Sequence, residues 1–312
     1  MNQFHNILFV SNGLADETES LKQVLSLARN NNATLNVLIV CLEFSDLMTV
    51  YKDKFEASLK TQLQQSIQSA RDTLNLSETD LPINIQVESG SIPAIRIVRQ
   101  VLKHSYDLIV KNAAQKEDGI GFTAIDMELL RKCPCPVWLC RPIERHRDNI
   151  HVAVAIDPIS DEKAGHDLSI RLLEISRSLA DNCDNKLNII SCWDHELEGF
   201  LRNNMWIDIP DNALSKSVED VRDKHYIALE ELIKKSNISG NIQVHHVRGA
   251  PQRMIPQFVD DLKIDILVMG TVARTGIDGF ICGNTAENTL QKLKCSLLAL
   301  KPNGFVSPIK AF

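Results

Sequence analysis

The sequence predicts an α/β protein made of two tandem doubly wound domains, each with a five-stranded parallel sheet. Short apolar runs alternate with amphipathic helical patterns, and the pattern of the first half recurs in the second after about 160 residues. The length of 312 residues also fits two domains of ordinary size. We place these domains at residues 1–143 and 150–312, joined near the polar, aperiodic stretch Ile143–Asn149.

The predicted strands are continuous apolar runs, as is typical of parallel strands covered by helices on both faces. Four such regions match between the halves in the same order, which indicates two homologous domains. The matched pairs are Ile7–Asn12 with Val152–Asp157, Val87–Pro93 with Val247–Pro251, Asp107–Lys111 with Asp265–Met269, and Val137–Pro142 with Leu297–Pro302.

Helices are expected between these strands. Apolar residues recur at steps of three and four from Phe55 to Leu74, and again from Val218 to Ile233. Each half is therefore predicted to contain strand, helix, strand, long helix, strand, helix, strand, helix and strand, with right-handed crossovers.

Composition excludes several classes of protein. Hydrophobic residues make up 44% of the chain, which rules out a disordered polypeptide, and no apolar stretch approaches the roughly 20 residues of a membrane span. The first residues show no signal peptide, so we expect a cytoplasmic protein. The net charge is −6 and no run of Lys or Arg exceeds two, so neither nucleic acid nor membrane is an expected partner.

The eight cysteines are expected to be reduced, because the chain is large and several of them lie in apolar runs. Cys133-Pro134-Cys135 lacks the two-residue spacer of redox and zinc motifs, so packing is favoured over redox sensing. His245 and His246 are neighbours on a predicted strand and point to opposite faces, which favours a polar strand end over a zinc site. No metal site and no catalytic residue is predicted.

The most informative segment is Gly270–Thr285, which follows an apolar run and contains four glycines within 14 residues. Ligands of open parallel sheets bind beyond the carboxyl ends of the strands. Backbone N–H groups of such a loop, and the helix starting near Asn284, can hold phosphate oxygens, with Arg274 adding a charge-assisted bond. Alternatively, the glycines only permit turns, and Asn284 with Glu287 forms a capping box.

This loop resembles the universal stress protein signature G-x2-G-x9-G-[ST], with Gly270 and Gly283 at the first and third glycines. Asp157 is similar in place to the family's aspartate beside adenine, and Gly249 with Pro251 resembles a family turn. The doubled chain resembles the tandem, type E members of Gram-negative bacteria. The resemblance implies the adenine nucleotide alpha hydrolase-like fold and ATP, possible with Mg²⁺, as ligand.

Two residues depart from the signature. Ala273 replaces the second glycine, at a cost of about 1 kcal/mol if that position needs a positive φ. Asn284 replaces the terminal Ser or Thr, although Thr285 follows it. The ligand contacts that the resemblance implies are Asp157, Ser191 and Cys192 near the base, and Gly270, Ala273, Arg274, Gly283, Asn284 and Thr285 near the ribose and phosphates.

The first half departs further from the signature. Asn12 stands in place of Asp157, and the residues after Lys111 lack the glycines in register. Lys116 is expected to be solvated rather than bound to phosphate. We therefore expect a degenerate nucleotide site in this half.

Apolar residues also gather after the second predicted strand of each half. They either cover an interface between the halves, which is the favoured interpretation, or line a pocket for an apolar ligand such as an acyl chain. The two groups are Phe44, Leu47, Met48, Val50 and Tyr51, and Phe200, Leu201, Met205, Trp206 and Ile207.

Three functions remain open at this point. The favoured one is a stress-response sensor or regulator that binds an adenine nucleotide in its second domain. The others are a slow ATPase at the same loop, with Asp278 or Glu287 positioning a metal, and a carrier of an apolar ligand. We expect the halves to pair through Val137–Arg141 and Leu297–Lys301, and two chains to be able to form a homodimer.

Overall fold

The fold is described from a computed structural model, which covers residues 3–41, 43–113, 119–160, 162–203, 209–271 and 283–311. The first half contains β1 (Asn6–Ser11), α1 (Thr18–Asn31), β2 (Thr34–Cys41), the 3-10 helix η1 (Asp46–Tyr51), α2 (Lys52–Leu74), β3 (Ile83–Ser89), α3 (Pro93–His104), β4 (Leu108–Asn112), α4 (Ala124–Lys132) and β5 (Val137–Cys140). The second half contains η2 (Arg147–Asn149), β6 (Val152–Ala155), α5 (Lys163–Asp181), β7 (Lys186–Trp193), α6 (Glu198–Asn203), α7 (Asp211–Lys235), β8 (Asn241–Arg248), α8 (Pro251–Asp261), β9 (Ile266–Gly270), α9 (Asn284–Leu290) and β10 (Ser296–Leu300).

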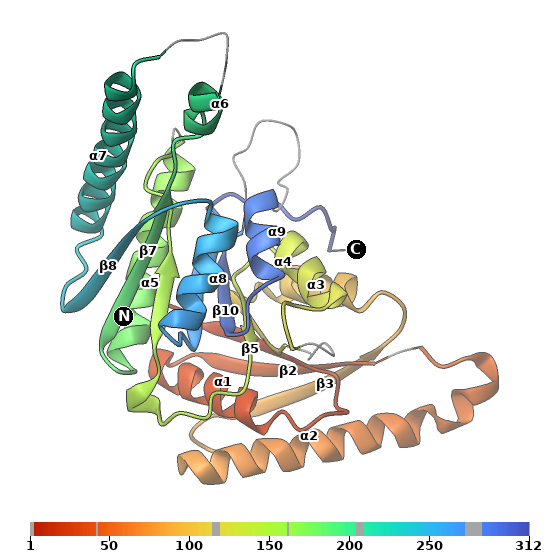
Figure 1. Cartoon of the computed structure of the whole chain (residues 1–312). Helices are drawn as coiled ribbons and strands as arrows, with labels where there is room; N and C mark the ends of the chain where they lie inside the picture. The colour runs from red at the N-terminus through yellow and green to blue at the C-terminus, as the bar shows by residue number, and fades with distance from the viewer. Residues whose placement is uncertain are drawn as a thin grey trace.

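The strands form one continuous ten-stranded sheet in the order β3-β2-β1-β4-β5-β10-β9-β6-β7-β8 (Figure 1). Within each half all pairs are parallel, and β1 and β6 occupy the corresponding places in their halves. This arrangement confirms the predicted pair of doubly wound parallel sheets. It also places the reversal of strand order between β1 and β4 in one half, and between β6 and β9 in the other.

Helices cover both faces of the sheet, and each face has one hydrophobic core that runs through both halves. The core under α1, α2, α5 and α7 includes Leu25, Leu63, Leu173 and Leu229. The core under α3, α4, α8 and α9 includes Ile97, Leu129, Val259 and Leu290. The apolar face predicted between Phe55 and Leu74 supplies part of the first core.

The halves meet at an antiparallel pair formed by β5 and β10, with Trp138 opposite Leu298. These are the two strands through which we expected the halves to pair. The contacts that flank the pair are reciprocal. After β5, the Arg141 guanidinium donates to the carbonyl of Leu293 at 3.5 Å, and after β10, Lys301 Nζ donates to the carbonyl of Cys133.

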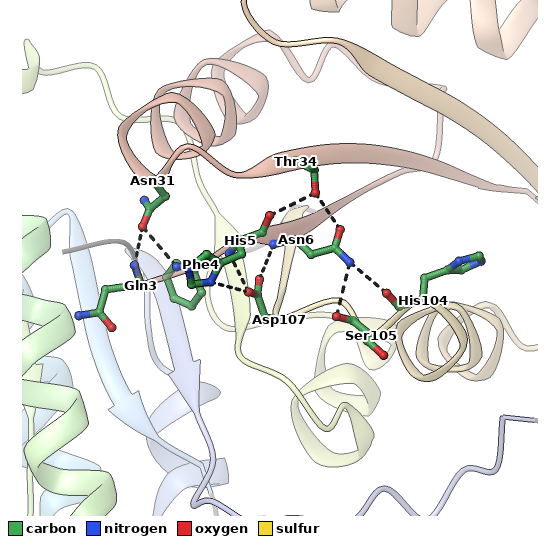
Figure 2. Close-up of polar contacts among 9 residues, drawn as sticks. All are labelled: Gln3, Phe4, His5, Asn6, Asn31, Thr34, His104, Ser105 and Asp107. Atoms are coloured by element: carbon green, nitrogen blue, oxygen red, sulfur yellow. Dashed lines mark hydrogen bonds and ion pairs between the residues drawn. The ribbon is translucent and has the colours of Figure 1, made fainter.

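The amino ends of corresponding strands are fixed by corresponding aspartates. The Asp107 carboxylate accepts hydrogen bonds from the backbone N–H groups of His5, at 2.7 Å, and Asn6, at 3.0 Å (Figure 2). Asp265 accepts a bond from the His151 N–H at 2.8 Å at the start of β6. The matched Asp107 and Asp265 of the sequence repeat therefore perform the same structural task.

The favoured interpretation of the apolar groups after β2 and β7 is wrong for the described residues. The junction of the halves lies at β5 and β10, whereas η1 and α6 lie toward opposite outer ends of the sheet (Figure 1). Leu47 and Val50 are 92% and 84% exposed, and Phe200 is 60% exposed. Met205, Trp206 and Ile207 lie outside the described residues. In the described part of the chain, no helix is both long and apolar enough to cross a membrane.

Candidate functional site

A cavity lies beyond the carboxyl ends of β6, β7 and β9, at the switch point of the second half. Its volume is about 610 Å³. Cavities of this size accommodate small organic ligands, and the switch point of a doubly wound sheet is their usual location. The described residues that line it include Ala155, Ile156, Asp157, Ser160, Glu162, Leu168, Cys192, Glu196, Met269, Gly270, Gly283, Asn284, Thr285, Pro302 and Asn303.

The candidates for the base end of a nucleotide lie on two strand ends. Asp157 lines the cavity, and its Oδ1 accepts a hydrogen bond from the Ile159 N–H at 2.9 Å. Cys192 also lines the cavity, and burial, followed by the nearby Asp157, raises the pKa of its thiol to about 11. Ser191 is fully buried, donates to the carbonyl of Ile156 at 3.1 Å, and is not among the described residues that line the cavity.

The candidates for the phosphate end are brought together by β9 and α9. Gly270, Gly283, Asn284 and Thr285 all line the cavity. A Cβ atom on Gly270 would lie 3.1 Å from Leu168 Cδ2, so a side chain there would require Leu168 to move by a few tenths of an ångström. Ala273 and Arg274 lie outside the described residues.

The expected capping box at the start of α9 is wrong. The N-cap residue is Gly283, whereas Asn284 is already helical, and no side chain caps this end. The Glu287 carboxylate instead accepts a hydrogen bond from Arg131 Nε of α4 at 2.7 Å. That bond lowers the pKa of Glu287 and ties α9 to the first half.

The described cavity lining is acidic. Asp157, Glu162 and Glu196 contribute carboxylates, and no Lys or Arg occurs among the described lining residues. A polyphosphate bound here would therefore need a cation, from Mg²⁺ or from the loop that contains Arg274. In the described part of the chain, no group of three or more His, Cys, Asp or Glu side chains is arranged to hold a metal by itself.

A cavity of about 480 Å³ occupies the corresponding place in the first half. It is called the first cavity below, and the cavity of the second half is called the second cavity. Asn12 lines the first cavity, and Asn12 Oδ1 accepts a bond from the Leu14 N–H at 2.9 Å, which repeats the turn at Asp157. The rest of its lining is mainly apolar. It includes Val10, Leu14, Val40, Phe44, Met48, Phe55, Ile97 and Ile125.

In the first half, an ion pair within the protein lies at the place that corresponds to the expected phosphate end of the second cavity. Lys111 Nζ lies 2.9 Å from Oδ1 of Asp126, whose side chain is fully buried in α4. The other oxygen, Oδ2, accepts bonds from the Thr123 N–H at 3.1 Å and the Thr123 hydroxyl at 2.8 Å. A carboxylate of the protein thus already occupies the amino end of α4, where an anion is favoured.

Sequence reasoning missed this ion pair. Strand register aligns Lys111 with Met269, and the equivalent starts of α4 and α9 align Asp126 with Ala286. The sequence feature that could have revealed the ion pair is that two oppositely charged residues of the first half align with two apolar residues of the second. It becomes visible only after the two halves are aligned through both the strand and the helix.

Known proteins share this architecture. The sequence pattern described as the universal stress protein family matches residues 3–141 and again residues 150–301. The chain belongs to the universal stress protein family. It carries the family's domain twice, once in each half of the continuous sheet.

Relatives of the tandem type match the whole chain. A protein named Universal stress protein E from Photorhabdus laumondii is 29% identical, covering 100% of this chain and 99% of its own length. The protein of the same name from Escherichia coli K12 is 27% identical, covering 99% and 98%. A solved universal stress protein from Pseudomonas aeruginosa has a TM-score of 0.67 at 20% identity, covering 97% of this chain and 95% of that one, and it supports the fold alone.

Proposed function

We propose that this tandem universal stress protein binds an adenine nucleotide, ATP with Mg²⁺, in the cavity of its second half. Binding would make it a sensor or regulator of a cytoplasmic stress response. The observation that carries the proposal is the cavity of about 610 Å³ at the switch point of the second half, with Gly270 and Gly283 on its wall. The corresponding cavity of the first half is less suited to a nucleotide, because Asp126, paired with Lys111, already occupies the amino end of α4 where a phosphate would bind.

The lining suggests how the ligand would be oriented. Asp157 and Cys192 would lie beside the base, while Gly270, Gly283 and Thr285 would lie beside the ribose and phosphates. Mg²⁺ would supply the positive charge that the described lining lacks. Binding is therefore expected to be much weaker when magnesium is removed with a chelator.

Hydrolysis of ATP at the same site would require a positioned water and charge stabilisation at the γ-phosphate. Glu287, one of two residues considered as metal ligands, is paired with Arg131 instead, and the other, Asp278, lies outside the described residues. This pairing favours binding without efficient turnover, which is checked by measuring phosphate release from saturating ATP.

The deciding experiment is a calorimetric titration of nucleotide-stripped protein with ATP and Mg²⁺. We expect one site per chain, and a Thr285→Asp variant should weaken binding by about tenfold or more through repulsion of the phosphates. The matched control is Ile125→Asp, because Ile125 and Thr285 are the second residues of α4 and α9 and each lines the cavity of its own half. An acidic residue is favourable in the first turn of either helix, so both variants should fold.

Two results would overturn the proposal. One is the absence of heat at millimolar ATP in the wild-type protein. The other is an equal loss of binding in the Ile125→Asp control, which would move the nucleotide away from the second cavity.

The apolar lining of the first cavity favours a second candidate function, the binding of an apolar ligand such as an acyl chain. Phe44, Met48 and Phe55 lie on its wall, and the exposed Leu47 and Val50 belong to the adjoining η1. Organic extraction of freshly purified protein followed by mass spectrometry tests this candidate. A Met48→Asp variant, at a lining side chain that is 48% exposed, should lose the extracted compound, and a wild-type extract without any such compound would argue against the candidate.

A further inference from the structure

Two cysteine thiols face each other in the turn between α4 and β5. The Sγ atoms of Cys133 and Cys135 are 3.4 Å apart and hydrogen-bonded. Cys133 is fully buried and Cys135 is 8% exposed. A disulfide would require these sulfur atoms to approach to about 2.05 Å.

A buried cation lies beside this thiol pair. Lys301, which follows β10, is 5% exposed and donates to the carbonyl of Cys133. Burial by itself raises the pKa of Cys133, but the hydrogen bond from Cys135 and the ammonium of Lys301 outweigh it and lower this pKa below its ordinary value. Burial and the neighbouring Cys133 raise the pKa of Cys135. The two thiols therefore differ in the way that an attacking and a resolving cysteine differ.

The second half provides an internal comparison. The pairing of the repeat aligns Cys135 with Cys295, and Cys133 with Leu293. Cys295 is equally buried, and burial raises the pKa of its thiol to about 12. The counterpart of Cys135 in the second half thus lacks a partner sulfur, because Leu293 stands at the place of Cys133.

We propose that Cys133 and Cys135 are a redox-active dithiol, which a hydroperoxide oxidises reversibly to a disulfide. The Cys133 thiolate attacks one peroxide oxygen, the O–O bond breaks, and a sulfenic acid forms. The other oxygen takes up the proton that the Cys133 thiol released and leaves as the first water, or as an alcohol. The Cys135 sulfur then attacks the sulfenic sulfur, the S–S bond forms, and the hydroxyl leaves as water with the Cys135 proton. Two electrons pass from the sulfurs to the peroxide.

Segment 302–311 forms no helix or strand and lies against the end of α4. Ser307 Oγ donates to the carbonyl of Lys132 at 2.7 Å, next to Cys133. Segments outside helices and strands open more easily than these elements. A small oxidant would reach the thiols through a local opening of this segment.

The turn and the end of α4 are each linked to a residue of the second half near the second cavity. Lys301 is followed by Pro302 and Asn303, which line that cavity, and Arg131 binds Glu287 of α9 just before the cysteines. A disulfide in the turn would shift these supports. If the proposed function is correct, on which this consequence rests, oxidation should change the affinity for ATP by about fivefold or more.

The test uses the full chain treated with hydrogen peroxide, then alkylated, unfolded and digested with trypsin. Cleavage after Lys132 and Arg145 releases both cysteines on one peptide, which also carries Cys140. A Cys140→Ala background therefore leaves only the two thiols of interest. We expect this peptide to lose two hydrogens and both alkylation sites, and dithiothreitol to restore them, while Cys295 stays reduced under the same treatment.

Single variants separate the two roles. In Cys135→Ser, Cys133 should be trapped as a sulfenic acid by dimedone, and in Cys133→Ser, Cys135 should remain a thiol. Circular dichroism of each variant verifies the fold, and the wild-type peptide gives the answer without any substitution at these two sites. A peptide that stays as reduced as Cys295, or that gains oxygen without forming the disulfide, would overturn the proposal.

Titration of the reduced and oxidised protein with ATP separates this proposal from the proposed function. A disulfide that forms in a protein without any ATP binding supports the dithiol and contradicts the nucleotide site. A disulfide that forms without a change in measured affinity supports the dithiol and contradicts its link to the cavity.

Discussion

The side chains of His225 and His246 form a buried contact that the sequence analysis did not anticipate. His225 Nδ1 and His246 Nε2 are 3.0 Å apart, and His225 is 4% exposed on α7. Burial lowers the pKa of both, and for His225 the neighbouring His246 lowers it further. The helical pattern from Val218 to Ile233 was recognised by its apolar residues, so a histidine on the buried face escaped attention. Periodicity identifies a face but not each residue on it.

This contact predicts how the stability of the protein depends on pH. A histidine whose pKa is lowered by folding binds protons more readily in the unfolded state, so stability falls as the pH drops below the ordinary value of about 6.5. The melting temperature of the wild type should therefore fall between about pH 7.5 and about pH 5.5, and that of His225→Gln should fall by a few degrees less. His5→Gln, at a side chain that is 70% exposed, is the control. Identical pH profiles for His225→Gln and the wild type would contradict the prediction.

At the scale of elements, β4 and α4 of the first half are joined by a buried ion pair where β9 and α9 of the second half have Met269 and Ala286. Removing one charge of a buried pair leaves the other unpaired, so Asp126→Ala should destabilise the protein by about 3 kcal/mol. The double variant Lys111→Met with Asp126→Ala copies the second half and should recover most of that loss. Urea unfolding measures both. A double variant as unstable as the single one would show that the helix cap at Thr123, rather than the charge pair, carries the stability.

The elements also show what could be predicted about the candidate site. Gly270 and Gly283 were located by their spacing, and Asp157 by the end of its strand, and the structure brings all three to one cavity. Ser191 was placed with its neighbour Cys192, but alternation along β7 turns only Cys192 toward that cavity. Glu287 was assigned to a capping box because its true partner, Arg131, is 156 residues away in sequence. Local spacing carries no information about such a distant contact.

For the whole molecule, the junction of the halves depends on Gly121, which has φ of +71° and whose N–H donates to the carbonyl of Leu293 at 2.9 Å. A Cβ atom there would lie 2.6 Å from the carbonyl oxygen of Gln291. Gly121→Ala should therefore cost about 1 kcal/mol for the backbone and about 1–3 kcal/mol more for the collision. Gly119, with φ of +67° and open space around it, is the matched control. Equal losses of melting temperature in Gly119→Ala and Gly121→Ala would contradict this role.

The overall fold was largely predictable, because alternating buried strands and amphipathic helices are encoded locally and the repeat doubles the signal. The apolar residues after β2 were assigned to the interface because composition cannot distinguish an exposed Leu47 from a buried one. Their true position follows from strand order, which places η1 at one outer end of the sheet. Strand order depends on crossover connections between segments that are distant in sequence, so local sequence patterns do not determine it.

The antiparallel junction between β5 and β10 has one more consequence. If two identical chains met in this way, every substitution near the junction would appear on both sides at once. Here the peptide link at η2 lets each side vary alone. Arg141 donates to the carbonyl of Leu293, whereas Lys301 donates to the carbonyl of Cys133. The pair Cys133 and Cys135 of the first half corresponds to Leu293 and Cys295 of the second. Because the two halves are joined in one chain, a substitution on one side of the junction has no copy on the other, and each half can carry contacts that the other lacks.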